Sequence, residues 1–212
     1  MGEARSSDAQ IRNALVSRLL AAGYVREQIR HEVPLDLASS DGRADLVVIR
    51  SDALVGVEIK SGKDTLERLT KQRPRYSARF DRIVIFSDAR HSPKHEPWWH
   101  GWETCSVTMT TSGAIEFGDN YWSGMGALTG SGIQRGSNHL SAAAMLSMLY
   151  TSEIRRIAGD PDATRSSDGP RLAEIMPMRE IRAAVSEALR SRAHNRWEDK
   201  FWQQFETAHV DA

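Results

Sequence analysis

The sequence is short of cysteine, of long hydrophobic runs and of any excess of charge of one sign. Cys105 is the single cysteine among 212 residues, which excludes an intramolecular disulfide and a cysteine-based zinc site. No stretch is long and apolar enough to span a membrane, and the charged residues among positions 1–25 exclude a signal peptide. We therefore expect a protein of the reducing cytoplasm that has no membrane partner.

Charge is balanced over the whole chain, with 28 basic and 28 acidic residues. A protein without a net positive field must bind any polyanion through a local arrangement of charge. The remaining composition, 40% hydrophobic and 26% charged residues, is typical of a globular protein with one good core and a small additional unit.

The first segment of the chain is predicted to be an amphipathic helix over residues 7–22. Its apolar residues recur at a four-residue step, Ser7 and Gln10 can form a capping box, and Gly23 can end the helix.

Three strands are predicted after this helix, over residues 28–37, 43–49 and 53–61. The first alternates apolar and polar residues around Pro34, which removes a main-chain donor and favours a sheet edge or a bulge. The connections are short, so the three strands are expected to form an antiparallel meander.

A second helix is predicted from Asp64, which can cap it, to about Phe80, with an apolar stripe that includes Tyr76. The β-rich run at 82–86 follows a crossover long enough to make it parallel to a neighbouring strand. The order helix, three strands, helix, strand indicates an α/β fold with a mixed sheet.

Beyond this core, residues 102–117 predict a hairpin that extends the sheet. The glycine-rich stretch at 119–137 predicts a linker, and residues 138–212 predict a helical C-terminal module with a polar loop at 159–169. We therefore expect a first domain over residues 1–118, followed by the linker and the helical module.

An acid and a base stand side by side at the end of the third strand, in the sequence VGVEIK. Side chains two residues apart on a strand share a face, so Glu58 and Lys60 are expected to lie together. Asp45, on the strand predicted to pair with this one, can approach Glu58 at the same end of the sheet. Two carboxylates can hold a hard divalent cation, and a lysine can position a water or stabilise charge on a phosphate. This set of residues suits phosphodiester hydrolysis.

An acid-x-Lys triplet alone is weak evidence, because about one is expected by chance in a chain of this length. A second triplet occurs at residues 198–200, within a helical pattern where its members share no strand face. Taken by itself, the Glu58–Lys60 pair is better explained as an ion pair on a solvated strand. Its place at the end of an apolar strand, one strand after Asp45 and directly before a helix, favours the functional interpretation.

This arrangement resembles the PD-(D/E)xK nuclease superfamily, whose members share the restriction-endonuclease-like fold. The resemblance covers residues 8–90, with GRADLVVI supplying the aspartate and GVEIK the Glu-x-Lys. It implies that Asp45 and Glu58 bind Mg²⁺ or Mn²⁺, that the main-chain carbonyl of Ile59 is a further ligand, and that Lys60 is the catalytic lysine. Glu32 is an additional candidate ligand, because some members bring another acid from this region; the alternative is that it faces solvent.

The second helix carries another similarity, because QRPRY at 72–76 is similar to the Gln-x-x-x-Tyr motif of the RecB-like nucleases. The four-residue spacing puts Gln72 and Tyr76 on one side of a helix, although Pro74 between them departs from a regular helix. The resemblance implies that Gln72 hydrogen-bonds near the metal site or a DNA phosphate and that Tyr76 supports it. Core packing is the alternative for Tyr76. A wider similarity, from VEIKSGKD to PWWHGW, is to a group of bacterial and phage proteins that carry this nuclease core.

The second helix also carries a basic patch beside the predicted site, to which Arg73 and Arg79 contribute. Phosphate contacts would be useful at this place. The candidate nucleic-acid-binding residues are Lys63, Arg68, Lys71, Arg75 and Tyr76. A solvated helix face is the alternative interpretation of the patch.

The expected function is that of a Mg²⁺- or Mn²⁺-dependent deoxyribonuclease in a phage, defence or repair setting. In it Asp45 and Glu58 hold the metal, Lys60 assists the attacking water, and Gln72 orients the water or the phosphate. RNA is the alternative substrate, and a homodimer or a protein partner is compatible with the sequence. The competing interpretation is a catalytically silent nuclease fold that binds DNA or a protein partner through the tryptophans at 98, 99 and 102 and the C-terminal helices.

Overall fold

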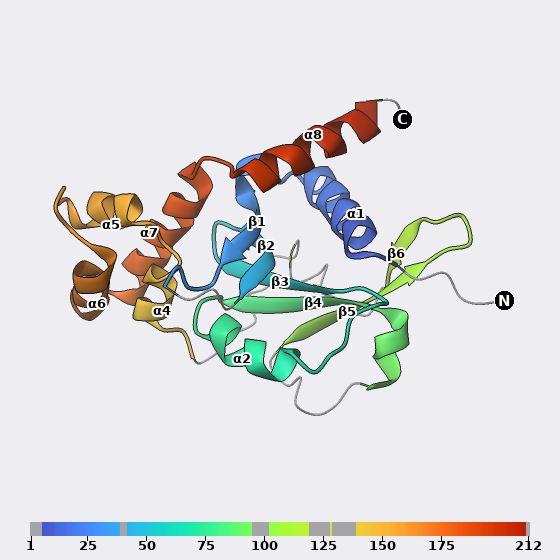
Figure 1. Ribbon diagram of the computed structural model, residues 1–212, viewed down its shortest axis with the longest axis horizontal. Helices are drawn as coiled ribbons and strands as arrows, with labels where there is room; N and C mark the ends of the chain where they lie inside the picture. Colours follow the sequence, from blue (N-terminus) through green and yellow to red (C-terminus); the bar gives the residue numbers. More distant parts are fainter. Residues whose placement is uncertain (1–5, 39–41, 95–101, 119–127, 129–138, 211–212) are drawn as a thin grey trace.

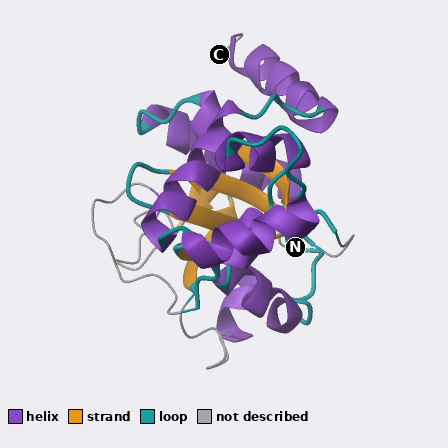
Figure 2. Ribbon diagram, turned by 90° about the vertical axis from the view of Figure 1, so that its left-hand side faces the viewer, coloured by secondary structure: helices purple, strands orange, loops and turns teal. Residues whose placement is uncertain are grey.

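The protein is built on a six-stranded mixed sheet with helices on both faces (Figures 1 and 2). The computed structural model describes residues 6–38, 42–94, 102–118, 128 and 139–210. The strands lie in the order of the chain: β1 (Ile29–Pro34), β2 (Arg43–Ile49), β3 (Leu54–Lys60), β4 (Arg82–Asp88), β5 (Glu103–Met109) and β6 (Ile115–Phe117).

Strand directions follow from the lengths of the connections. β1, β2 and β3 form the predicted antiparallel meander, and β5 and β6 form the predicted hairpin. β4 is parallel to β3 because the helical crossover between them returns the chain to the end of the sheet at which β3 begins. β5 is in turn parallel to β4. The α/β fold with a mixed sheet is confirmed.

Helix α1 (Asp8–Ala21) begins and ends where the sequence predicted. The Ser7 hydroxyl accepts a hydrogen bond from the Gln10 main-chain nitrogen at 3.3 Å, and the Gln10 side chain accepts one from the Ser7 nitrogen at 3.0 Å. Gly23, just beyond the helix, has a φ of 89°, a left-handed conformation that glycine adopts without steric cost.

Helix α2 (Leu69–Ser77) begins five residues after Asp64, so the predicted cap is wrong. The Asp64 carboxylate instead accepts hydrogen bonds from the main-chain nitrogen and the hydroxyl of Ser61, at 2.8 and 2.6 Å. It thereby closes a turn after β3 instead of capping a helix. Pro74 lies inside α2, which nevertheless continues to Ser77.

Within the described residues from 139 onward, the chain forms five helices: α4 (Ala142–Leu146), α5 (Thr151–Ala158), α6 (Arg165–Ile175), α7 (Met178–Ser191) and α8 (Arg196–Val210). The predicted polar loop at 159–169 is too long, because Thr164 caps α6 by accepting a hydrogen bond from the Ser167 nitrogen. None of the helices in the described ranges combines the length and the apolarity needed to cross a bilayer.

The helices of the N-terminal and C-terminal parts together cover both faces of the sheet. α1 and α8 bury one face, where Phe201, Trp202 and Phe205 join the core. α2 and the helices α4 to α7 bury the other, with Tyr76 and Phe80 beside residues of the C-terminal helices such as Leu189. The predicted linker at 119–137 lies outside the described residues except for Leu128. That residue is buried, and its carbonyl accepts hydrogen bonds from Tyr24 and Arg50.

Candidate functional site

Asp45 lies where the pairing of β2 with β3 stops. The two strands pair from Ile49 opposite Leu54 to Leu46 opposite Val57, and Asp45 is the next residue along β2. Its carboxylate oxygen Oδ2 accepts a hydrogen bond from the main-chain nitrogen of Ile59 at 2.6 Å. The side chain therefore takes over a hydrogen bond of the sheet, and it is held towards the carboxyl end of β3.

The pairing is also interrupted on the other side of Asp45. β1 pairs with β2 at His31 and again at Val33, and the intervening Glu32 has a φ of 50°. A residue other than glycine in the left-handed region costs on the order of 1–3 kcal/mol, and such positions concentrate at functional sites. The irregularity thus surrounds the residue that the sequence predicts as a metal ligand.

Glu58 is the point on which the other predicted residues converge. It is 3% exposed. Its Oε1 lies 2.7 Å from Lys60 Nζ and accepts a hydrogen bond from Gln72 Nε2 at 2.8 Å. Its Oε2 accepts a hydrogen bond from the Tyr76 hydroxyl. β3 supplies the acid and the lysine, and α2 supplies the amide and the phenol from one side of the helix, despite Pro74.

Burial and like charge act together on the ionisable groups of this cluster. Burial raises the pKa of Asp45 well above its usual range, and the nearby Glu58 carboxylate raises it further. Burial also raises the pKa of the Tyr76 hydroxyl, again with a contribution from Glu58. Tyr76 therefore stays protonated at neutral pH and donates its hydrogen bond to Glu58. Two carboxylates that share a low-dielectric site favour either a proton or a cation between them.

The residues of this cluster supply oxygen donors, the type that Mg²⁺ and Mn²⁺ prefer. The described residues contain no group of three or more His, Cys, Asp or Glu side chains arranged to hold a metal. Two carboxylates are available, with the Ile59 carbonyl between Glu58 and Lys60 in the chain. The buried Gln72 Oε1 has no hydrogen-bond partner within the described ranges. A hydrated divalent cation, whose waters donate hydrogen bonds, fits this donor set.

Glu32 shares the Arg12 guanidinium with Asp45, and no contact joins it to Glu58 within the described residues. Its Oε1 is 3.1 Å from an Arg12 guanidinium nitrogen. Burial raises the pKa of Glu32, and the charge of Arg12 opposes that effect. As placed, Glu32 is a partner of Arg12.

The basic patch of the second helix is divided between surface and core. Lys63, Arg68, Lys71, Arg73 and Arg75 are exposed. Arg79 is buried, and its guanidinium donates to the Leu35 carbonyl and to the Ser147 hydroxyl, so it joins the C-terminal helices to the sheet. Tyr76 has no exposed surface and packs on Phe80 and Trp102. Its place is in the core beneath Glu58 and not among the surface contacts that were predicted for it.

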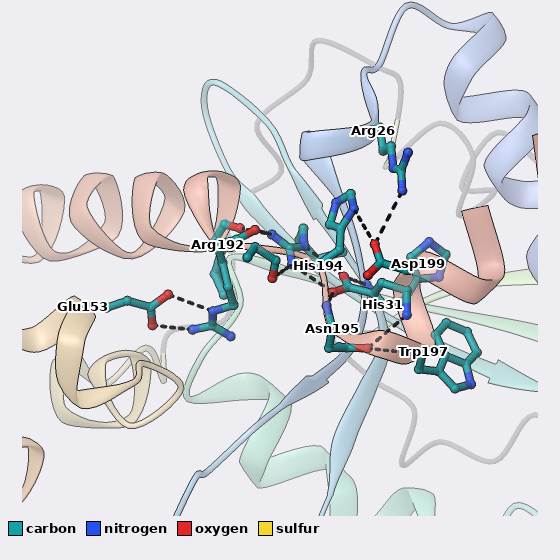
Figure 3. Close-up of polar contacts among 12 residues, drawn as sticks. Arg26, His31, Glu153, Arg192, His194, Asn195, Trp197 and Asp199 are labelled. Atoms are coloured by element: carbon teal, nitrogen blue, oxygen red, sulfur yellow. Dashed lines mark hydrogen bonds and ion pairs between the residues drawn. The ribbon is translucent and has the colours of Figure 1, made fainter. Parts of the chain in front are cut away.

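A second polar cluster, which the sequence analysis missed, joins α8 to β1. Arg30 donates from Nε and Nη2 to the two oxygens of Glu198, both at 2.9 Å, and both side chains are 2% exposed. Figure 3 shows the neighbouring contacts, in which Asn195 caps α8 and Arg192 pairs with Glu153. The second acid-x-Lys triplet is thus helical, as predicted, and its glutamate has a structural partner. A signal existed in the charged Glu198 on the apolar face that Trp202 and Phe205 share.

Comparison with known proteins concerns the N-terminal part of the chain. Residues 1–97 match the family model described as Bacteriophage P4 protein cII. The matched segment covers less than half of the chain but contains α1, α2 and strands β1 to β4, and with them every residue of the cluster around Glu58. The match concerns a phage family and does not name a nuclease. Comparison with curated proteins and with solved structures found no match.

Proposed function

We propose that this protein is a Mg²⁺- or Mn²⁺-dependent nuclease that hydrolyses DNA phosphodiester bonds in a phage-related setting. One observation carries the proposal: Lys60, Gln72 and Tyr76 converge on the Glu58 carboxylate, and Asp45 is held against the same end of β3. The residues come from three elements and meet at a break in strand pairing. The similarity of residues 1–97 to a phage protein supports the setting.

Each side chain has a task that its position allows. Asp45 and Glu58 would hold the cation, with the Ile59 carbonyl as a further ligand. When bound, a divalent cation supplies Lewis-acid activation of a phosphate oxygen and of a water. Lys60 Nζ, 2.7 Å from Glu58, would orient the attacking water and stabilise the charge that develops on the phosphate. Gln72 can donate to Glu58 while its free carbonyl oxygen accepts a hydrogen bond from that water.

The exposed basic residues before and along α2 supply the substrate contacts. Lys63, Arg68, Lys71 and Arg75 lie on the segment that follows Lys60 directly. Cations at such positions bind phosphates without reading the bases, so they position a strand but do not select its sequence. This supports a polynucleotide as the substrate rather than a small phosphate ester.

The decisive experiment is a cleavage assay on supercoiled plasmid, linear duplex, single-stranded DNA and RNA, with Mn²⁺ or with EDTA. We expect Mn²⁺-dependent cleavage of DNA that Lys60→Ala abolishes. Lys200→Ala is the matched control, because it removes the exposed lysine of the other acid-x-Lys triplet. Cleavage of RNA alone would move the substrate to RNA. The absence of metal-dependent cleavage of every substrate would overturn the proposal.

A catalytically silent fold that binds DNA or a protein partner is the second candidate. It is favoured by the fact that both Glu58 oxygens, and both Asp45 oxygens, already have partners on this chain. In that case the cluster fixes α2 to the sheet and does no chemistry. DNA binding would then be unaffected by EDTA and by Glu58→Gln, whereas a metal-dependent nuclease would lose its Mn²⁺ response with that substitution.

A further inference from the structure

Arg12 lies on the acidic side of the candidate site, where no motif of the sequence predicted a functional residue. Its side chain is 3% exposed. Its Nη1 donates to the main-chain oxygen of Asp45 at 2.5 Å. Its Nη2 donates to Glu32 Oε1 at 3.1 Å and lies 3.7 Å from Asp45 Oδ1. Its Nε donates to Asp8 Oδ1 at 3.0 Å. One planar guanidinium thus connects α1, β1 and β2.

The contact with the Asp45 main chain is made where the sheet is interrupted. β1 and β2 pair on both sides of the Glu32–Asp45 position but not at it, and β2 does not pair with β3 at Asp45. A main-chain carbonyl without a strand partner must find another donor when it is buried. Arg12 supplies that donor, so it fixes the strand at the residue whose carboxylate meets the end of β3.

Helix α8 keeps Arg12 in this place. The Trp197 ring lies over the guanidinium, with Arg12 Cζ 5.1 Å from the ring centroid. Trp197 is in turn stacked on Phe201, with 5.7 Å between the ring centroids. A guanidinium covered by an aromatic ring and held by three carboxylates has little freedom to turn towards solvent.

We propose that Arg12 is a positioning residue of the metal site, which raises the affinity for a divalent cation by holding Asp45 in register with Glu58. This inference rests on the proposed function, because it assumes that Asp45 is a ligand. A positioning role and a purely electrostatic role of Arg12 predict opposite effects on the affinity for the metal. A positive group beside a cation site repels the cation, so a purely electrostatic Arg12 would weaken metal binding, and its removal would strengthen it.

The test measures Mn²⁺ binding directly, by electron paramagnetic resonance of free Mn²⁺ in titrations of the full chain. Outer residues that orient metal ligands typically change affinity by about 10- to 100-fold. We therefore expect Arg12→Gln to weaken Mn²⁺ binding at least about tenfold. Arg12→Lys should weaken it as well, because an ammonium cannot reach the Asp45 carbonyl and the carboxylates together. Arg18→Gln, an exposed arginine on the same helix, is the control and should bind Mn²⁺ like the wild type.

A second variant keeps the inference testable should Arg12→Gln fail to fold. Trp197→Leu changes no charge, and the ring that it removes is 42% exposed, so the fold should tolerate it. It uncovers Arg12 and should also weaken Mn²⁺ binding. Affinity equal to or above that of the wild type in Arg12→Gln, or in Trp197→Leu where Arg12→Gln does not fold, would overturn the inference. So would full affinity in Arg12→Lys, since the hydrogen bonds of the planar guanidinium would then not be needed.

The outcomes separate this inference from the nuclease proposal. Mn²⁺ binding without cleavage would refute the nuclease. The Mn²⁺ affinities of the Arg12 variants relative to the wild type would then still decide whether Arg12 positions the site. Cleavage with unchanged affinity in the Arg12 variants would refute the positioning role and leave the nuclease standing. A wild type that binds no Mn²⁺ would refute both.

Discussion

His31 should make the stability of this protein fall as the solution becomes mildly acidic. His31 lies on β1 and is 1% exposed, and the centroid of its ring lies 4.2 Å from the ring centroid of Phe201 on α8. Neither ring nitrogen has a hydrogen-bond partner within the described ranges. Burial lowers the pKa of His31 from 6.5 to about 2. The groups around it add to this effect, since the charges of Arg12, Arg30, His194 and Arg26 all oppose a proton on the ring.

The sign and the size of the effect follow from these two pKa values. Between pH 6.5 and about 2 the unfolded chain binds a proton on His31 that the folded protein does not, so the free energy of unfolding falls as the pH falls. Each pH unit in this window corresponds to about 1.4 kcal/mol. At pH 5 the loss attributable to His31 is therefore about 2 kcal/mol relative to pH 7.

The assay compares urea unfolding at pH 7 and pH 5 in the wild type and in His31→Leu, followed by circular dichroism. Leucine keeps an apolar side chain of similar size at the site and loses no side-chain hydrogen bond. The wild type should lose about 2 kcal/mol more than the variant between the two pH values, whatever their relative stability at pH 7. His139→Leu, at an exposed position, should behave like the wild type. Equal losses in His31→Leu and the wild type would refute the reasoning.

Two further predictions concern the buried ion pair and the basic surface. Glu198→Gln should lower the free energy of unfolding by about 3–5 kcal/mol in urea titrations at pH 7, because it leaves Arg30 buried without a counter-charge. The control, Asp199→Asn on the exposed side of α8, should have little effect. Replacing both Arg68 and Lys71 by glutamine should reduce the slope of log affinity for duplex DNA against log salt by about two units, and the same double change at the exposed Arg179 and Lys200 should leave that slope unaltered.

The parts of the fold that local pattern determines were predicted well. The strand over 43–49 has the bounds of β2, and the capping box of α1 is formed by the predicted pair, Ser7 and Gln10. Errors occurred where a side chain had two possible partners close in the chain. Asp64 could cap a helix or close the turn after β3, and it bonds Ser61 instead. Spacing alone does not decide between such partners, because both lie within hydrogen-bonding reach of the same carboxylate.

Of the candidate site, spacing predicted the half that lies on consecutive elements. Glu58 and Lys60 meet because they are two residues apart on a strand. Gln72 and Tyr76 reach Glu58 because α2, which follows β3 in the chain, packs on the face of the sheet where Glu58 lies. Arg12 was missed because two of its partners, Glu32 and Asp45, lie on β1 and β2, and their approach depends on how α1 packs. The sequence did contain a trace of it: an arginine four residues after Asp8, on the same side of the helix as the buried Leu15 and Val16.

Arg12 connects the first and the last helix on one face of the sheet, since it lies on α1 and Trp197 of α8 covers it. Helices far apart in the sequence therefore contribute to one site. The sheet brings Asp45 to Glu58 only by giving up its regular pairing on both sides of Asp45. A break of this kind leaves a main-chain carbonyl and two carboxylates close together, and it is stable only if a donor with several N–H groups fills it. Arg12 is that donor, and Trp197 of α8 covers it. The geometry of the acids at the end of β3 is therefore set in part by the last helix of the chain, which the residues of the motif alone would not indicate.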